Sequence, residues 1–300
     1  MKKAVFYLVY PVLWLVSKLP FSIFYKVSDF CFLIVYYIVG YRKKVVRDNL
    51  QKSFPEKSFS ELKQIEKKFY QHMCDMFLEM IKTLSISNKQ LKKRFIYENI
   101  EELVNFEKQC NGTIVMCGHY ASYEWATAIN FYDTHNKAYA VYKKIRNQYF
   151  DKLIKDIRAN LGTTLINSKE VIPTMVRNKV NNQKASYYMI SDQSPKRSKS
   201  AYWVDFMGRE TAAFNGSEAM AKKLGFGILY LQIRKVKRGY YSAKLIPLTT
   251  TAKESKDAEL TQKFFHLLEE QIREQPEYYL WTHKRWKHKK EACVTPQASS

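Results

Sequence analysis

From about residue 113 onward, short runs rich in β-branched and aromatic residues alternate with segments that space their apolar residues as helices do. Alternation of this kind is typical of βαβ units, in which helices join successive strands of one sheet. The sequence therefore predicts an α/β fold with a mainly parallel central sheet flanked by helices. The predicted strands are residues 113–118, 138–142, 163–166, 185–191, 228–233 and 240–247, and the predicted helices are residues 122–132, 147–161, 169–180, 215–224 and 257–274.

The composition narrows the classes of protein to which the chain can belong. Of its 300 residues, 46% are hydrophobic and 26% are charged, which excludes a mainly disordered, collagen-like or low-complexity chain. The net charge of +22 indicates an anionic partner, whether nucleic acid, an anionic membrane or an acidic protein. The five cysteines include no C-x-x-C pair and no matching histidine spacing for zinc, which favours a reducing compartment.

The first forty residues are the most apolar part of the chain. Two apolar blocks, 4–16 and 30–41, are each shorter than the roughly 20 residues that a membrane-spanning helix needs. Four charged or helix-breaking residues lie between them: Lys18, Pro20, Lys26 and Asp29. No small-x-small cleavage site follows the first block, which disfavours a signal peptide. Positive charge on both flanks favours a re-entrant hairpin or an interfacial helix, with a single tilted span as the alternative. We therefore predict an N-terminal membrane-associating helical segment, residues 1–45, followed by one α/β domain, residues 46–300.

A long helix is predicted between the apolar segment and the first strand. The sequence Ser58-x-x-Glu61 has the form of a capping box, which marks the first turn of a helix. Apolar residues at helical spacing continue from there as far as Leu84. One stripe of this helix is expected to pack against the domain.

The segment 113–126 contains the strongest candidate for catalysis. Its apolar run ends at Gly118 and His119, and Glu124 falls in the first turn of the helix predicted to follow. Both side chains would then lie at the carboxyl end of a strand, where open α/β sheets form their ligand crevice. An imidazole and a carboxylate in this position suit a general base and the group that orients it. The alternative is a loop histidine beside a glutamate that only stabilises the helix N-terminus.

The other five histidines have weaker claims to a function. Three are expected to be structural: His72, His135 and His266. His283 and His288 belong to a basic run rich in tryptophan, residues 281–290, which suits a solvated tail, a nucleic-acid patch or an anionic lipid surface. The sequence contains no phosphate-binding loop and no G-x-S-x-G elbow, which disfavours nucleotide hydrolysis and serine hydrolysis.

Four ordered blocks resemble the lipid A biosynthesis acyltransferases, the lauroyl and myristoyl transferases within the lysophospholipid acyltransferase superfamily. The resemblance runs over nearly the whole chain. The first block is Arg47-Asp48-Asn49-Leu50 with Phe54-Pro55-Glu56, and the second is His119-x-x-x-x-Glu124. The third block has three parts: Arg158 with Gly162, Ser191-Asp192-Gln193, and Val204-Asp205-Phe206-Met207-Gly208. The fourth block extends from Pro276 to Trp286. Four blocks in order are far more specific than any one alone.

The resemblance implies an enzyme on the cytoplasmic face of the bacterial inner membrane that moves an acyl chain from acyl carrier protein to a hydroxyl of a lipid A precursor. It implies that His119 and Glu124 form the catalytic dyad and that Arg158 and Asp192 support substrate or transition state. The implied partners are acyl carrier protein, an anionic lipid acceptor and the inner membrane, without nucleic acid, cofactor or metal. Because the thioester is already activated, His119 as general base suffices, and a backbone N–H or Arg158 would hold the oxyanion.

Two other functions remain open at this stage. The same dyad would serve an O-acyltransferase that acts on a lysophospholipid or an aminoacyl lipid. A membrane-tethered nucleic-acid-binding protein is the alternative from another class, because the isoelectric point is about 9.6 and the C-terminal region is aromatic and basic.

Overall fold

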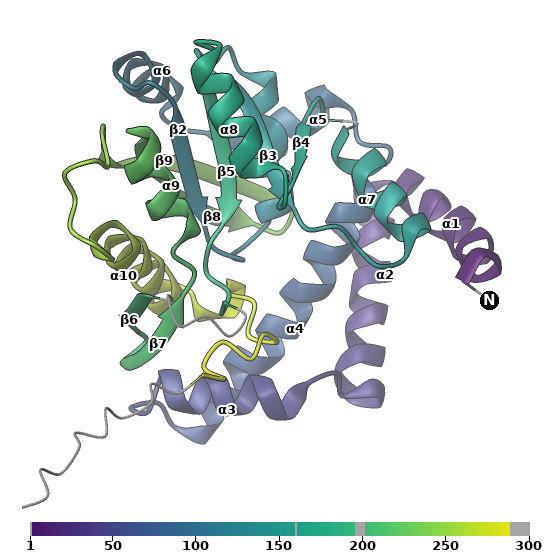
Figure 1. Cartoon of the computed structure of the whole chain (residues 1–300). Coiled ribbons are helices and arrows are strands. Elements are labelled where there is room, and N and C mark those ends of the chain that lie inside the picture. Colours follow the sequence, from purple (N-terminus) through teal and green to yellow (C-terminus); the bar gives the residue numbers. More distant parts are fainter. Residues whose placement is uncertain (1, 160, 196–201, 289–300) are drawn as a thin grey trace, which may run out of the picture.

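A seven-stranded sheet forms the centre of the computed structural model, which describes residues 2–159, 161–195 and 202–288 (Figure 1). The strand order is β1-β9-β8-β2-β5-β3-β4. Strands β8, β2, β5, β3 and β4 are parallel, β9 is antiparallel to β8, and β1 is parallel to β9. The predicted α/β fold with a mainly parallel sheet is therefore confirmed. The strands are β1 Phe95–Tyr97, β2 Thr113–Cys117, β3 Lys137–Tyr142, β4 Thr164–Asn167, β5 Ala185–Ile190, β8 Gly227–Lys237 and β9 Tyr240–Thr249.

Each of the six predicted strand runs is a strand of this sheet. Every residue of β2 is buried, as expected for a parallel strand covered on both faces. A second sheet is the antiparallel hairpin of β6 Tyr202–Phe206 and β7 Arg209–Ala213, which was not predicted. Its two turn residues, Met207 and Gly208, have φ of 55° and 69°. Positive φ at both central residues is what the favoured two-residue hairpin turn requires.

Helices cover the sheet in the places that the sequence predicts. Helix α9 packs against β2 and β8, and α10 packs against β8, β9 and the hairpin strand β6. The predicted helix after β2 forms as a 3-10 helix, η2, in which the Thr127 hydroxyl donates to the Glu124 carbonyl three residues earlier. The bounds in this part of the chain are α5 Asn88–Arg94, α6 Ile100–Gln109, η2 Tyr123–Phe131, α7 Gln148–Ala159, α8 Val171–Val180, α9 Gly216–Leu224, α10 Glu259–Glu274 and η3 Pro276–Tyr278.

The N-terminal part consists of α1 Lys2–Lys18, α2 Phe21–Leu33 with its π-helical continuation η1 Ile34–Val39, α3 Lys43–Ser53 and α4 Phe59–Lys82. The predicted capping box of α4 is present, because Ser58 Oγ accepts from the Glu61 amide and the Glu61 carboxylate accepts from the Ser58 amide. Lys82 of α4 donates to the carbonyls of Ser17 and Leu19, each at 2.6 Å. This lysine therefore holds the corner between α1 and α2 against the domain.

The second apolar helix is longer than the sequence predicted. Residues Phe21–Val39 form 19 residues of continuous helix with mean hydropathy 1.5, long and apolar enough to cross a membrane by length and composition. Residues 30–39 of the second apolar block therefore belong to a longer helix, because the helix passes through Lys26 and Asp29. Lys26 is exposed, and Arg238 donates to Asp29 at 2.6 Å, so neither charge interrupts the helix.

Helices α1 and α2 lie at one side of the molecule (Figure 1). Many of their apolar side chains are exposed. On α2, Phe24 and Phe32 are buried, and α2 packs along α4. On α1, Phe6 stacks on Tyr149 of α7 with ring centroids 5.5 Å apart. The exposed apolar residues of α1, α2 and η1 include Val5, Leu8, Val12, Leu15, Ile23, Phe30, Leu33 and Ile38.

Candidate active site

His119 lies in the turn that follows β2, at the carboxyl end of the strand as the sequence predicted. The residue before it, Gly118, faces α10 so closely that a Cβ atom would come within 2.7 Å of Leu268 Cδ1. Two residues after His119, Ala121 has a φ of 50°, in the left-handed region that residues with a side chain rarely adopt. The turn that carries the histidine is thus tightly packed and strained, a combination common at functional sites.

Asp192 is the carboxylate that contacts His119. It follows β5, which pairs in parallel with β2 so that Cys117 is the partner of Ile190. The two strand ends meet, and His119 Nδ1 lies 2.6 Å from Asp192 Oδ1. The Asp192 side chain is only 2% exposed.

The contact between His119 and Asp192 shifts their two pKa values in opposite directions. Burial by itself lowers the pKa of His119, but the charge and hydrogen bond of Asp192 outweigh it and hold this pKa above its ordinary value. Burial by itself raises the pKa of Asp192, but the charge and hydrogen bond of His119 hold this pKa below its ordinary value. With Nδ1 bonded to an ionised carboxylate, Nε2 is the ring nitrogen left to accept a proton.

The surroundings of Nε2 are polar on one side and aromatic on the other. The Gln193 amide nitrogen lies 3.2 Å from Nε2 and donates to it when Nδ1 carries the proton. The ring of Tyr123 meets the imidazole edge-on, with centroids 5.0 Å apart. These contacts fix the orientation of the imidazole, with Nε2 facing the Gln193 amide.

Glu124 is bound to Arg158 instead of to the imidazole. The guanidinium of Arg158, at the end of α7, donates to both carboxylate oxygens of Glu124, at 2.9 and 2.6 Å. The side chains are 21% and 12% exposed, so the pair is largely shielded from water. Glu124 acts on His119 through its charge, which contributes to the raised pKa of the imidazole. The structure thus brings all four predicted residues into one site, with Asp192 in the orienting contact that the sequence suggested for Glu124.

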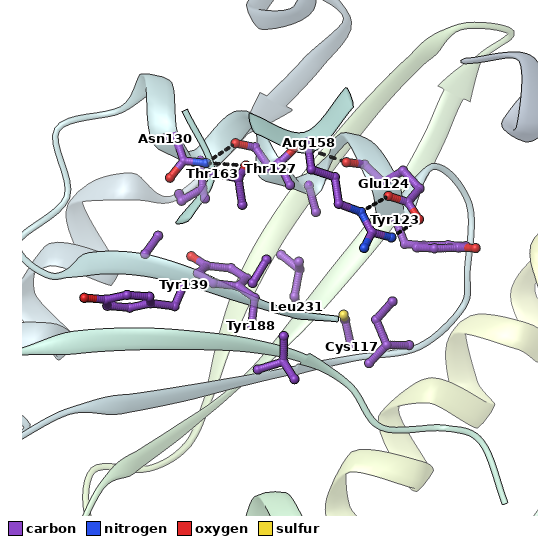
Figure 2. A pocket seen from close by; sticks show the side chains of 16 residues that line it. Cys117, Tyr123, Glu124, Thr127, Asn130, Tyr139, Arg158, Thr163, Tyr188 and Leu231 are labelled. Carbon is purple, nitrogen blue, oxygen red and sulfur yellow. Dashed lines mark hydrogen bonds and ion pairs between the residues drawn. The ribbon is translucent and has the colours of Figure 1, made fainter. Parts of the chain in front are cut away.

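A cavity with an empty volume of about 570 Å³, part of it open to solvent, adjoins this site (Figure 2). Figure 2 shows the bonded Arg158 and Glu124 among its lining residues. Apolar and aromatic side chains from η2, β3 and β5 form most of the remaining wall. They include Ala126, Ile129, Ala138, Val141, Tyr188 and Ile190.

One thiol also faces the cavity. Burial raises the pKa of Cys117 far above the ordinary thiol value. It is therefore a neutral thiol, unsuited to act as a nucleophile. Cys31, Cys74 and Cys110 are free as well, and Cys293 lies outside the described residues.

The C-terminal run packs beside His119, in contrast to the surface patch or solvated tail that was predicted. The Leu280 amide donates to the His119 carbonyl at 3.0 Å, and the Ala121 amide donates to the Tyr278 carbonyl at 2.9 Å. Trp281 is fully buried and Arg285 is 1% exposed. Of the predicted run, residues 289–290 lie outside the described part of the chain. We call residues 276–288 the C-terminal strap.

The first sequence block fastens the strap in place. The side-chain amide of Asn49, on α3, donates to the carbonyls of Trp281 and His283, at 2.8 and 2.9 Å. Arg42 donates to the carbonyl of Thr282 at 3.0 Å. The first and fourth blocks, more than 200 residues apart, therefore meet beside the turn that carries His119.

Comparison with known proteins agrees with this arrangement of blocks. The model of the bacterial lipid A biosynthesis acyltransferase family matches residues 1–288. This chain belongs to that family. It is 21% identical over 284 residues to a lipid A biosynthesis palmitoleoyltransferase of Escherichia coli K12, covering 92% of this chain and 89% of the relative. It is 22% identical over 283 residues to a lipid A biosynthesis lauroyltransferase of the same strain, covering 93% and 90%.

Family membership confirms the resemblance drawn from the four sequence blocks. This lipid A acyltransferase therefore catalyses acyl transfer in lipid A biosynthesis, with a lipid A precursor as the class of acceptor. The signal that sequence reasoning lacked was the pairing of His119 with Asp192. It becomes visible only once β2 and β5 are known to be neighbours, because the two residues are 73 positions apart.

Proposed function

We propose that this acyltransferase moves an acyl chain from acyl carrier protein to a hydroxyl of a lipid A precursor, with His119 as the general base. The observation that carries the proposal is the 2.6 Å contact between His119 Nδ1 and Asp192 Oδ1. This contact leaves Nε2 as the proton acceptor and supplies a negative charge that stabilises the imidazolium.

The reaction then proceeds in two proton-coupled steps. His119 Nε2 takes the proton of the acceptor hydroxyl as its oxygen attacks the thioester carbonyl and forms a tetrahedral oxyanion. The carbonyl re-forms as the C–S bond breaks, and the imidazolium returns its proton to the leaving thiolate. Asp192 remains ionised throughout, because its pKa is held below the ordinary value.

Arg158 is a suitable group to stabilise the oxyanion. Two of its N–H groups are taken by Glu124, and a guanidinium has five in total. The Glu124 carboxylate fixes the plane of the guanidinium and offsets the cost of burying its charge. We assign Glu124 to the catalytic machinery through this contact and through its charge on His119.

The adjoining cavity supports a site for the acyl chain. Its mainly apolar wall suits a hydrocarbon, as the apolar lining of ligand pockets generally does. Glu124 and Arg158 line the same cavity, so a chain bound there would lie next to the groups that act on its thioester.

We further infer that residues 1–45 associate with the cytoplasmic face of the inner membrane. The exposed apolar side chains of α1 and α2 support this, as do the lysines and arginines that flank them. An interfacial position is supported by the polar contacts of α2 with α4, such as Ser28 Oγ to Asp75 at 2.7 Å. The net charge of +22 suits both an acidic carrier protein and an anionic acceptor.

A transfer assay with purified protein tests the proposal. Acyl carrier protein thioester and acyl-coenzyme A serve as donors, and a lipid A precursor, a lysophospholipid and an aminoacyl lipid serve as acceptors. We expect one new lipid A species, heavier by a single acyl group in mass spectrometry, formed with the carrier-protein donor. Transfer only to another acceptor, or only from coenzyme A, would contradict the proposed substrates. Equal transfer by a folded His119→Ala variant would contradict the proposed base.

A further inference from the structure

Glu79, on α4, is a buried carboxylate that the proposed mechanism does not use. It has no solvent exposure, and its carboxylate accepts hydrogen bonds from hydroxyls of three separate parts of the chain. The Tyr25 hydroxyl of α2 donates to Oε1 at 2.8 Å. The Ser122 hydroxyl donates to Oε2 at 3.1 Å, and the Tyr241 hydroxyl of β9 donates to the same oxygen at 2.9 Å.

The backbone of Glu79 makes a further contact with the active-site region. Its carbonyl accepts from the indole nitrogen of Trp125 at 3.1 Å. Ser122 and Trp125 stand on either side of Tyr123 and Glu124. One residue of α4 therefore holds both ends of the short stretch whose side chains contact the imidazole of His119 and the guanidinium of Arg158.

The segment 119–124 needs such support. Ala121 is in the left-handed region of φ, which costs energy and persists only where the surroundings fix it. The C-terminal strap fixes the segment at His119 and Ala121 through backbone hydrogen bonds. Glu79 fixes it from the other side at Ser122, and the same carboxylate binds Tyr25 on an apolar N-terminal helix.

We propose that Glu79 is a positioning residue that couples the docking of helix α2 to the geometry of segment 119–124. The coupling path is Tyr25 to Glu79 to Ser122. When α2 packs against α4, the Tyr25 hydroxyl binds the Glu79 carboxylate. The carboxylate in turn fixes the positions of Ser122 and the nearby Glu124. This inference rests on the proposed function in assigning segment 119–124 to catalysis.

Two tyrosine variants provide a matched test. Tyr25→Phe and Tyr241→Phe each remove one hydroxyl from the same carboxylate, but only Tyr25 belongs to α2. We expect Tyr25→Phe to lower kcat about tenfold, equivalent to about 1.4 kcal/mol, with little change in KM for the donor. Tyr241→Phe should lower kcat less than Tyr25→Phe does, by about threefold at most, because it leaves the hydrogen bond from α2 to the carboxylate intact.

A second variant separates coupling from simple loss of stability. If Tyr25 and Ser122 act through one path, the double variant Tyr25→Phe, Ser122→Ala should have about the same kcat as the slower single variant. Independent structural roles would instead multiply the two losses. A double variant with fully multiplied losses would overturn the proposed path.

Hydrogen–deuterium exchange tests the same coupling without a substrate. Backbone amides in residues 119–125 should exchange faster in Tyr25→Phe than in Tyr241→Phe, with the rest of the sheet unchanged. Unchanged exchange in Tyr25→Phe would overturn the inference whatever the donor proves to be. Absence of transfer by the parent protein, with the exchange difference present, would refute the proposed function alone.

Discussion

Replacing Asp192 by asparagine tests the central contact of the site with little change of shape. The amide oxygen of asparagine still accepts from His119 Nδ1, so the variant removes mainly the negative charge. At a separation of about 4 Å and an effective dielectric constant of about 20, that charge is worth about 4 kcal/mol to an imidazolium, or about three pKa units. We expect kcat to fall about 100- to 10,000-fold, because the protonated base forms in the transition state.

The pH profile gives the sign of the effect. The pKa of His119 is raised in the parent protein. The transfer activity of the parent should therefore be lost as the pH falls through a value above 6.5. In Asp192→Asn that pKa drops, and the acid limb of the profile should move to lower pH while the plateau is lower. Initial rates of transfer from acyl carrier protein, measured between about pH 5 and 9, would show both changes. Circular dichroism and thermal unfolding serve as the folding control. A folded variant with an unchanged plateau and an unchanged acid limb would refute the assignment of Asp192 to His119.

Four further substitutions test the remaining parts of the site and the residue that supports it. Glu124→Gln leaves Arg158 without its anionic partner, so we expect loss of activity and a decrease of about 3 kcal/mol or more in the free energy of unfolding. Adding Arg158→Gln to this variant should restore stability in a denaturant titration but should not restore activity. Relative to the parent, Glu79→Gln should raise the free energy of unfolding more at pH 8 than at pH 5. Burial raises the pKa of Glu79 from 4.5 to about 7. The stability that the neutral carboxyl contributes to the folded parent is therefore complete below pH 4.5 and is lost as the pH rises through about 7. This contribution is at most about 3 kcal/mol. Ala140→Leu narrows the cavity and should shift the preferred donor to a shorter acyl chain, which mass spectrometry of the products would detect. Unchanged chain preference would exclude this cavity as the acyl site.

The strands were predictable because burial on both faces leaves a plain signature in the sequence. Strand β2 is apolar or small throughout, and β5 and β8 are dominated by apolar and aromatic residues, so each was visible as a run. Strand β1 has only three residues, too few for a run to be recognised. The β6-β7 hairpin depends on Met207 adopting positive φ, which a methionine does not signal.

The residues of the candidate site were predictable from the sequence, but the contacts between them were not. His119, Glu124 and Asp192 could be placed from their positions at strand ends and helix starts. Their partners depend on strand order and on the position of α7, which local sequence patterns do not specify. For the same reason the tryptophan-rich run was misjudged. Trp281 and Arg285 are buried by contacts with distant residues, such as the bond from Arg285 to Thr211.

The C-terminal strap implies an order of events during synthesis of the protein. The ribosome completes α1, α2 and all four residues of the candidate site before it adds the strap that fastens the His119 turn. Until the strap has docked, the turn that carries His119 lacks the backbone hydrogen bonds from Leu280 and to Tyr278. The His119 turn should therefore reach its final geometry only after residues 278–283 have been synthesised and have bound Asn49 and the turn itself.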